Sequence, residues 1–491
     1  MDLPFTPQSA LTRPVADEWI REGVERESRN RKRRATLGLS VMLLVALVCP
    51  TIQILSPIQI LLPRSSSRAL SRPLYELFDF GLVGMWLGLW VFRPKLIAVR
   101  PRWLQATLFL YPAAFFVSTV AFAQRGGALE LKHYYALINS LRPVALVALT
   151  VALARWGRLA DAQIDSVNNR VVFIVAVSAF FVSGLTLLQT ADSVPAQDFL
   201  HTFYTYENIG WQDMASMAIE NYGRATSIFR WANSLGMFLA LTLLLLLPTL
   251  AWGRRSRLIM LVPVLTCLVA LVLSGSRSGL IALTVGIAIV FLAQRQARML
   301  ILVGIVVLAV VAGMSLVEAR TGNVSRFTEL FDYVTERGPM PYNLAGRLTN
   351  TGYTLTQFSA HARSIWTGTT VTEYDSLIWR SFDNEYLKHL VWNGILGLIA
   401  FVGFEVGIMA YVLRLLRRGR ELTTSKLLTG SLAGMVVAMA ITAYSQDVWS
   451  QPKVMHLVLI LLGILVYVDD SQTGLPPVWR PETVSAQPRS G

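Results

Sequence analysis

The chain has 491 residues, of which 54% are hydrophobic and only 15% are charged. Soluble domains carry about 25% charged residues, so a chain of this length with this deficit must place much of its surface in a solvent other than water. The composition excludes a soluble enzyme and predicts an all-α polytopic membrane protein. The net charge of +14 lies in short clusters between apolar runs, so we expect no nucleic-acid partner.

The first 34 residues are polar, and they end in a basic run from Arg29 to Arg34. The apolar stretch that begins near Ala35 is long enough to stay in the membrane, so we expect a retained helix instead of a cleaved signal peptide. The two cysteines, Cys49 and Cys267, lie inside apolar runs. They predict neither a disulfide framework nor a metal site, and we expect no metal and no cofactor.

About twelve apolar runs approach the ~20 residues that a helix needs to cross a bilayer. Several are short and need flanking residues to complete a span. The predicted spans are 35–55, 76–92, 104–123, 136–154, 171–190, 232–252, 258–273, 280–294, 299–316, 390–413, 427–445 and 455–468.

The positive-inside rule places the N-terminus in the cytoplasm, because basic residues concentrate in three short loops that then lie on that side. An even number of spans puts both termini there. The loops contain Arg93, Lys95, Arg100 and Arg102, then Arg254, Arg255 and Arg257, then Arg414, Arg417, Arg418 and Arg420. The predicted parts of the chain are a basic N-terminal segment (1–34), nine helices with an outer segment at 191–231 (35–316), a large outer segment of short helices (317–386), the last three helices (387–468) and a disordered tail (469–491).

Two arginines lie beside predicted helix starts on the outer face. Arg224, in GRATSIFRWANSLG, precedes a helix that begins near Asn233. An arginine there can bind an anion together with free backbone N–H groups, although it can also simply reach lipid headgroups. Arg277 lies in LSGSRSGLIAL, a polar turn between two apolar helices. Its guanidinium, the serine hydroxyls and the backbone N–H groups can together bind a phosphate, and an ordinary hairpin with an exposed arginine is the alternative.

Two further motifs lie in or after the large outer segment. Arg347, in NLAGRLTNTGYTL, means little alone, because that segment holds several other arginines. DNEYLKHLVWNGILGLIAF places Asp383 and Glu385 directly before a helix that enters the membrane near Leu390. Capping and the helix dipole favour acids at such a position, but a carboxylate near arginines at the membrane surface can also act as a general base. His389 is a second candidate base.

Arg142 lies inside the predicted helix 136–154. Placing an arginine in lipid costs roughly 2.5 kcal/mol or more on insertion scales. We therefore expect its side chain to face the bundle interior or a polar cavity, paired with a carboxylate or a phosphate. A structural and a substrate-binding role both stay open.

The order and spacing of these motifs resemble the O-antigen ligase and O-antigen polymerase superfamily of bacterial polysaccharide enzymes, over roughly residues 222–401. The similar features are the arginine segment that ends in Asn-x-x-Gly, the Ser-Arg-Ser-Gly hairpin, the Gly-Arg segment of the outer loop, and the Asp-Asn block with Gly394 and Gly397. The first 200 residues add only topology to the resemblance.

The resemblance implies a metal-independent glycosyltransferase of the bacterial inner membrane that takes a glycan from undecaprenyl diphosphate on the periplasmic face. Preorganised guanidinium groups would neutralise the departing diphosphate. We expect this role for Arg224, Arg277 and Arg347, with Arg142 as a further candidate. The implied partners are an undecaprenyl-diphosphate-linked oligosaccharide, membrane lipids and a chain-length-regulating polysaccharide co-polymerase.

One departure from the ligase pattern favours the polymerase branch. Ligases have a histidine where this chain has Asp383. We therefore expect a polymerase that joins repeat units of an exopolysaccharide or O-antigen, with Asp383 as the general base and Glu385 as the fallback. The alternatives are a ligase that transfers the glycan to a lipid A core or a protein, and a transporter or flippase without chemistry. Few charged residues lie inside the apolar runs, which argues against transport.

Overall fold

The protein is described by a computed structural model. The described residues are 13–52, 80–157, 159, 161–191, 194–195, 225–227, 229, 232–252, 257–295, 304–305, 308, 311–313, 342–360, 365–369, 384–418, 423–446, 448–449 and 452–472.

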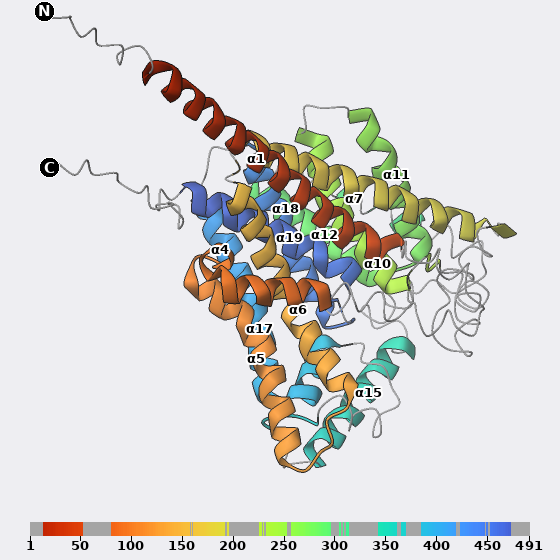
Figure 1. Cartoon of the computed structure of the whole chain (residues 1–491). Coiled ribbons are helices and arrows are strands. Elements are labelled where there is room, and N and C mark those ends of the chain that lie inside the picture. Colours follow the sequence, from red (N-terminus) through yellow and green to blue (C-terminus); the bar gives the residue numbers. More distant parts are fainter. Residues whose placement is uncertain are drawn as a thin grey trace, which may run out of the picture.

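Within these residues, every regular element is a helix, which confirms the all-α prediction (Figure 1). The helices are α1 (Arg13–Ile52), α4 (Pro94–Ile97), α5 (Arg102–Gln124), α6 (Leu131–Gly157), α7 (Asp161–Thr190), α10 (Ala232–Trp252), α11 (Arg257–Ser274), α12 (Arg277–Ala293), α15 (Tyr342–Ala360), α17 (Glu385–Arg417), α18 (Thr423–Ala443) and α19 (Pro452–Gln472).

Seven of the described helices are long and apolar enough to cross a membrane. They are α5, α6, α7, α10, α17, α18 and α19, and three shorter apolar helices cover Phe80–Phe92, Met260–Ser274 and Arg277–Ala293. The chain is thus a multi-pass membrane protein by length and composition. The predicted span 299–316 lies mostly outside the described residues, as do most of 191–231 and much of 317–386.

Antiparallel packing of α12 and α18 defines the two ends of the bundle. Gln294, after α12, donates from Nε2 to Lys426 O at 2.8 Å, near the start of α18. Gly286 and Gly434 meet halfway along, where a Cβ on either residue would crowd the other's carbonyl oxygen. Glycines at both positions therefore let the two helices approach closely. One end of the bundle contains the starts of α10, α12 and α17 and the last turns of α7, α11 and α18. We call it the site end.

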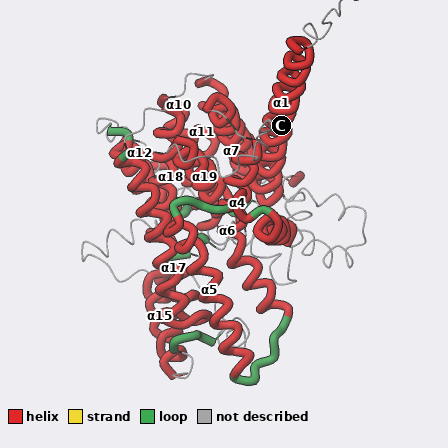
Figure 2. The backbone as a smooth tube through the Cα atoms, turned by 60° about the vertical axis from the view of Figure 1, so that its left-hand side comes forward, coloured by secondary structure: helices red, strands yellow, loops and turns green. Residues whose placement is uncertain are grey.

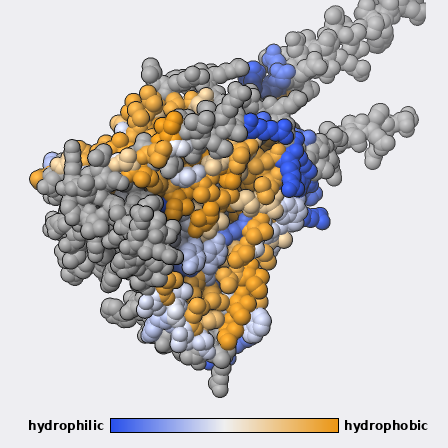
Figure 3. Space-filling view, turned by 180° about the vertical axis from the view of Figure 1, so that it is seen from behind, coloured by the Kyte–Doolittle hydropathy of each residue, from blue (hydrophilic) through white to orange (hydrophobic). Residues whose placement is uncertain are grey.

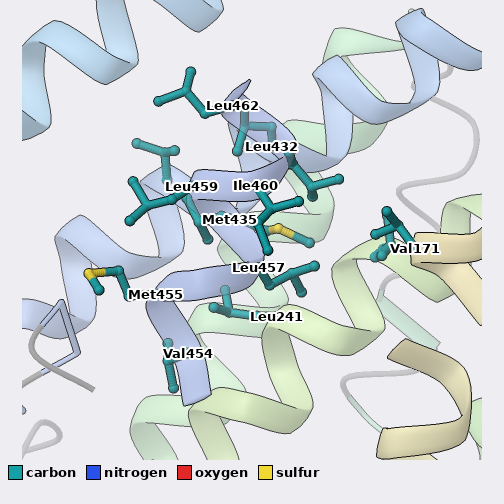
Figure 4. Packing of buried hydrophobic residues seen from close by; sticks show 14 of the residues in the cluster. Val171, Leu241, Leu432, Met435, Val454, Met455, Leu457, Leu459, Ile460 and Leu462 are labelled. Carbon is teal, nitrogen blue, oxygen red and sulfur yellow. The ribbon is translucent and has the colours of Figure 1, made fainter. Parts of the chain in front are cut away.

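The last helix, α19, lies in the centre of the bundle. Residues 458–462 have no exposed surface, and five consecutive helical residues point in all directions around the helix axis. Figure 4 shows side chains of α19 packed among those of α10 and α18, including Leu241 and Leu432. The apolar core is therefore built around α19, with α6 as another neighbour.

We call the end opposite the site end the basic end. There, ion pairs connect the last turn of α19 to neighbouring helices. Arg155 of α6 pairs with Asp470, and Arg418, which directly follows α17, donates to Asp469 Oδ1 at 3.0 Å. The predicted tail boundary at Asp469 is therefore wrong, because α19 continues to Gln472. These acids lie against arginines from two other helices, which holds that turn in helical form.

The N-terminal helix α1 begins far outside the bundle and enters it at the basic end (Figure 1). Ala35 packs against Gly157 at the end of α6, and Gly38 packs against Leu153 one turn deeper. The part of α1 before Ala35, which includes the basic run, therefore extends past the end of α6. The first described residues, in α1, and the last described residues, in α19, therefore lie at the same end of the bundle.

Much of the outward surface is apolar. Figure 3 shows hydrophobic residues across the visible helices and strongly hydrophilic residues gathered at one end. Exposed apolar side chains include Phe116 on α5, Phe173 on α7 and Ile399 on α17. Helices that are buried on one side and apolar on the other are the expected form of a bundle in lipid.

Candidate functional site

The segment that follows Arg224 is bound by the ends of two helices. Backbone N–H groups of residues 226 and 227 donate to Gln189 Oε1, in the last turn of α7, at 3.1 and 2.8 Å. The backbone N–H of Ala225 donates to Leu273 O, in the last turn of α11, at 3.1 Å. The first arginine motif therefore lies beside the α11–α12 turn. Arg224 itself is outside the described residues.

The α11–α12 turn is capped by its own serine and packs tightly on α10. Ser276 Oγ accepts the backbone N–H of Gly279 at 3.1 Å and lies 3.5 Å from Asn233 Oδ1. A Cβ on Gly236 would overlap Ser276, and a Cβ on Gly279 would overlap the backbone of Gly236. Arg277, the first residue of α12, is half-buried at this junction. The first two motifs thus meet at one place.

The start of α17 carries a capping side chain and a fully buried acid. Asn384 Oδ1 accepts the backbone N–H three residues further on, at 3.0 Å. The Glu385 side chain has no exposed surface, and its Oε2 accepts the backbone N–H groups of Val448 and Trp449, both at 2.9 Å. This geometry favours an anchoring role for Glu385 over proton transfer. Asp383 lies outside the described residues.

His389 is enclosed by aromatic rings and has no exposed surface. Its ring centroid lies 4.3 Å from that of Phe401, 5.1 Å from Tyr111 and 6.0 Å from Phe115. Its Nε2 is 4.0 Å from Glu385 Oε1. Enclosure between α5 and α17 favours a packing role over the general-base role considered from the sequence.

A second buried acid, Glu405, ties the same elements together. Its Oε1 accepts Trp449 Nε1–H at 2.7 Å, and its Oε2 accepts the Tyr386 hydroxyl at 2.8 Å. The Tyr386 hydroxyl is also 2.8 Å from Ala440 O on α18. Glu405 is not among the site residues predicted from the sequence, although a lone acid inside an apolar run is a signal that could have found it.

The helix α17 is broken at Gly394, whose φ of 70° and ψ of −166° are not helical. A break leaves backbone groups without their usual partners, which is costly in a bilayer. Residues 365–369, which we call the clasp, supply the partners. The N–H of Ile395 donates to a clasp carbonyl at 2.9 Å, and the N–H of Thr369 donates to Val391 O at 2.8 Å.

The clasp fits the break through a second glycine, Gly368, with a φ of 74°. A Cβ on Gly368 would overlap the backbone of Trp392, and a Cβ on Gly394 would overlap that of the clasp. Ser118 Oγ, on α5, lies 2.6 Å from a clasp carbonyl and 3.0 Å from Trp392 O. The clasp therefore fastens part of the large outer segment to α5 and α17 together.

α15, the helix that carries the third motif, contacts the start of α17, which carries the fourth. Phe358, near the end of α15, forms a buried cluster with Leu387 and Val391 of α17. Arg347 lies on the same helix, 11 residues or about three turns before Phe358. The structure describes its backbone but not its side chain. Figures 1 and 2 both show α15 beside α5 and α17.

The α18–α19 turn connects the two pairs of motifs. Thr442 Oγ1 on α18 lies 3.4 Å from Met237 Sδ, one residue after the glycine that packs on the α11–α12 turn. On its other side, the turn is bound through Val448 and Trp449 to Glu385. All four motif segments therefore belong to one end of the bundle.

Arg142 is only 3% exposed and lies 11 residues after the start of α6, roughly 16 Å along the helix. It donates from Nη2 to Asn139 Oδ1. Helices α6 and α19 run parallel, with Gly463 against Thr150, so His456 lies at about the level of Arg142. The side chain thus faces the bundle interior, as its cost in lipid predicts, and it is deeper than the motif segments. Among the described residues, no cluster of His, Cys, Asp and Glu side chains could hold a metal ion.

Comparison with protein families gives one finding. Residues 262–402 match the family model described as O-antigen ligase. The matched range contains three of the four motifs and begins after the Arg224 segment. It confirms the resemblance to the O-antigen ligase and polymerase superfamily over these residues, and it does not separate the two branches. Comparison with curated proteins finds no match.

Replacing Gly394 by alanine should release the clasp. The substitution forces a side chain into a left-handed conformation, at about 1–3 kcal/mol, and adds the overlap with the clasp backbone. We expect faster hydrogen exchange at residues 365–369 and a lower melting temperature. Gly352 on α15 has nothing within 4 Å of an added Cβ, so Gly352→Ala is the control: it should leave exchange at residues 365–369 unchanged and should not lower the melting temperature. Unchanged exchange in Gly394→Ala would show that the clasp is not held by the break.

Proposed function

We propose that this protein, which resembles O-antigen ligases and polymerases over its matched residues, is a glycosyltransferase that acts on lipid-diphosphate-linked glycans. The observation that carries the proposal is the meeting of the motif segments at one end of the bundle, within and beside the residues of the family match. By the positive-inside rule the basic end is cytoplasmic. The site end then faces the periplasm of a bacterial inner membrane, with both termini in the cytoplasm.

The α12 start is the proposed diphosphate site. The first N–H groups of a helix and its dipole favour an anion, and Arg277 adds a half-buried guanidinium at the same point. A guanidinium presents a rigid planar fork that binds two phosphate oxygens side by side, a geometry that an ammonium does not provide. Arg224 is proposed to join it, because its following residues are bound to the last turn of α11. Arg347 is proposed to approach from α15, while the depth of Arg142 favours a structural role.

In the proposed reaction, the oxygen of an acceptor hydroxyl forms a bond to the anomeric carbon of the donor sugar. The bond between that carbon and the diphosphate oxygen breaks, and its electron pair leaves with the lipid diphosphate. The hydroxyl proton passes to the carboxylate of Asp383, which precedes the cap of α17. The arginines lower the barrier by stabilising charge that develops on the leaving group.

We propose the polymerase activity, in which the acceptor is the terminal sugar of a second repeat unit. The supporting observation is the sequence Asp383–Asn384 at a position where ligases have a histidine. A ligase that transfers the glycan to a lipid A core or another acceptor is the second candidate, because the matched family model is described as O-antigen ligase. The proposed partners are the lipid-linked oligosaccharide, membrane lipids and a chain-length-regulating co-polymerase.

The purified full-length protein in lipid nanodiscs tests the proposal. Undecaprenyl-diphosphate-linked repeat units should be extended to longer glycans without added metal. Transfer to a lipid A core with no self-extension would identify the ligase. Translocation across proteoliposomes without any change in glycan length would identify a transporter and overturn the enzymatic proposal.

Arg277→Lys should reduce turnover by about 10- to 100-fold, because the charge remains but the guanidinium fork is lost. The melting temperature should stay near that of the wild type. Arg295, just after α12 at the basic end, offers a matched control beyond the opposite end of this helix. Arg295→Lys should leave turnover unchanged. Equal turnover in both variants would assign Arg277 to packing instead of diphosphate binding.

Substitutions at Asp383 and at Glu385 should distinguish the proposed general base from the residue that anchors the α18–α19 turn. Asp383→Asn should lower turnover about 100-fold or more with little change in melting temperature. Glu385→Ala should lower the melting temperature, since two buried backbone N–H groups lose their acceptor at roughly 1–3 kcal/mol each. Glu385→Gln keeps an acceptor oxygen and should retain both stability and turnover. A stable but inactive Glu385→Gln would instead make Glu385 the base.

A further inference from the structure

Gln446, in the turn after α18, carries a buried amide that makes no hydrogen bond within the part of the chain that the structure describes. Its side chain is 6% exposed, and its backbone N–H donates to Thr442 O at 2.9 Å. Neither the side-chain Oε1 nor Nε2 has a hydrogen-bond partner among the described residues. A buried polar group without a partner costs about 1–3 kcal/mol, so a chain folded for stability alone would place an apolar residue there.

The helix register places Gln446 beside the diphosphate side of the site. In the antiparallel α12–α18 pair, the contacts of 286 with 434 and of 294 with 426 put the start of α12 level with the end of α18. Gln446 follows that end by three residues. Thr442, to which it is bonded, contacts Met237 of α10. The same turn then continues to the residues that Glu385 holds. Gln446 thus lies on the turn that runs from the end of α18, level with the start of α12, to the residues bound at the start of α17.

The hydrogen-bonding groups of the Gln446 amide indicate which class of ligand it can bind. Oε1 accepts hydrogen bonds and Nε2–H₂ donates them. A phosphate oxygen accepts only, so it would satisfy Nε2 and leave Oε1 buried without a donor. A sugar hydroxyl both donates and accepts, and adjacent hydroxyls on a pyranose ring can satisfy both ends of one amide.

We propose that Gln446 is a saccharide-binding residue that recognises hydroxyls of the sugar attached to the lipid diphosphate. The proposal rests on the proposed function, since it needs the diphosphate at the α12 start. It adds a sugar subsite between the arginine that binds the leaving group and the segment that carries the base. The amide, which has no partner among the described residues, then bonds to the sugar through both its ends.

Binding of two probes to the full-length protein in nanodiscs tests this proposal. The probes are undecaprenyl diphosphate and undecaprenyl diphosphate that carries one hexose. Gln446→Met keeps the length of the side chain and removes the amide. Its affinity for the sugar-bearing probe should fall about 10- to 100-fold, and its affinity for the sugar-free probe should not change. Its melting temperature without ligand should equal or exceed that of the wild type.

Gln294 at the basic end provides the contrasting control, because its Nε2 donates to Lys426 O at 2.8 Å. Gln294→Met should lower the melting temperature and leave the affinities for both probes unchanged. A Gln446→Met variant that binds both probes like the wild type overturns the sugar subsite and leaves the proposed function intact. Loss of stability or failure to fold in Gln446→Met also overturns it, since the amide would then be structural. A wild type that binds neither probe overturns the proposed function itself.

Discussion

The structure depends on one constraint of the bilayer, namely that every buried backbone N–H and C=O group needs a partner. At the site end this constraint is met by a few side chains and one short segment. Gln189 accepts the N–H groups of residues 226 and 227, and Glu385 accepts those of residues 448 and 449. The clasp at 365–369 completes the broken helix α17. Irregular backbone at the end of a membrane bundle is stable only because these acceptors and donors are buried with it.

These same bonds hold the chemistry-bearing segments in place. A glycosyl transfer without a metal must stabilise the leaving diphosphate with fixed donors, because donors that reorganise during the reaction lose most of their effect. Here the α11–α12 turn is capped by Ser276 and locked on α10 by Gly236. The start of α17 is fixed by Asn384 and Glu385. Buried structural bonds therefore supply the rigidity that the proposed site requires.

Helix periodicity and charge predicted most of the helices in the bundle. They did not predict the contacts at the ends of the helices. Apolar runs located α5, α6, α7, α10 and α17 to α19, because a span in lipid needs a long apolar segment whatever its neighbours. The tail boundary failed at Asp469, since charge and polarity in the sequence do not reveal that Arg418 and Arg155 neutralise those acids. The order of the motifs indicated that Arg277 and the Arg224 segment belong together. The roles of Glu405 and the clasp depend on pairings 19 to 249 residues apart, which one sequence cannot specify.

The arrangement of the motif pairs also separates the proposed diphosphate site from the proposed base. One pair surrounds the α12 start and the other surrounds the α17 start, and the described links between them run through the α18–α19 turn. That turn is tied to both sides by buried bonds, so neither pair can shift without straining the other. In the proposed polymerase reaction two lipid-linked glycans approach from the membrane, and this turn lies between the proposed diphosphate site at the α12 start and the α17 start that follows the proposed base. The α18–α19 turn is therefore part of the proposed site, together with the four motifs that were identified from the sequence.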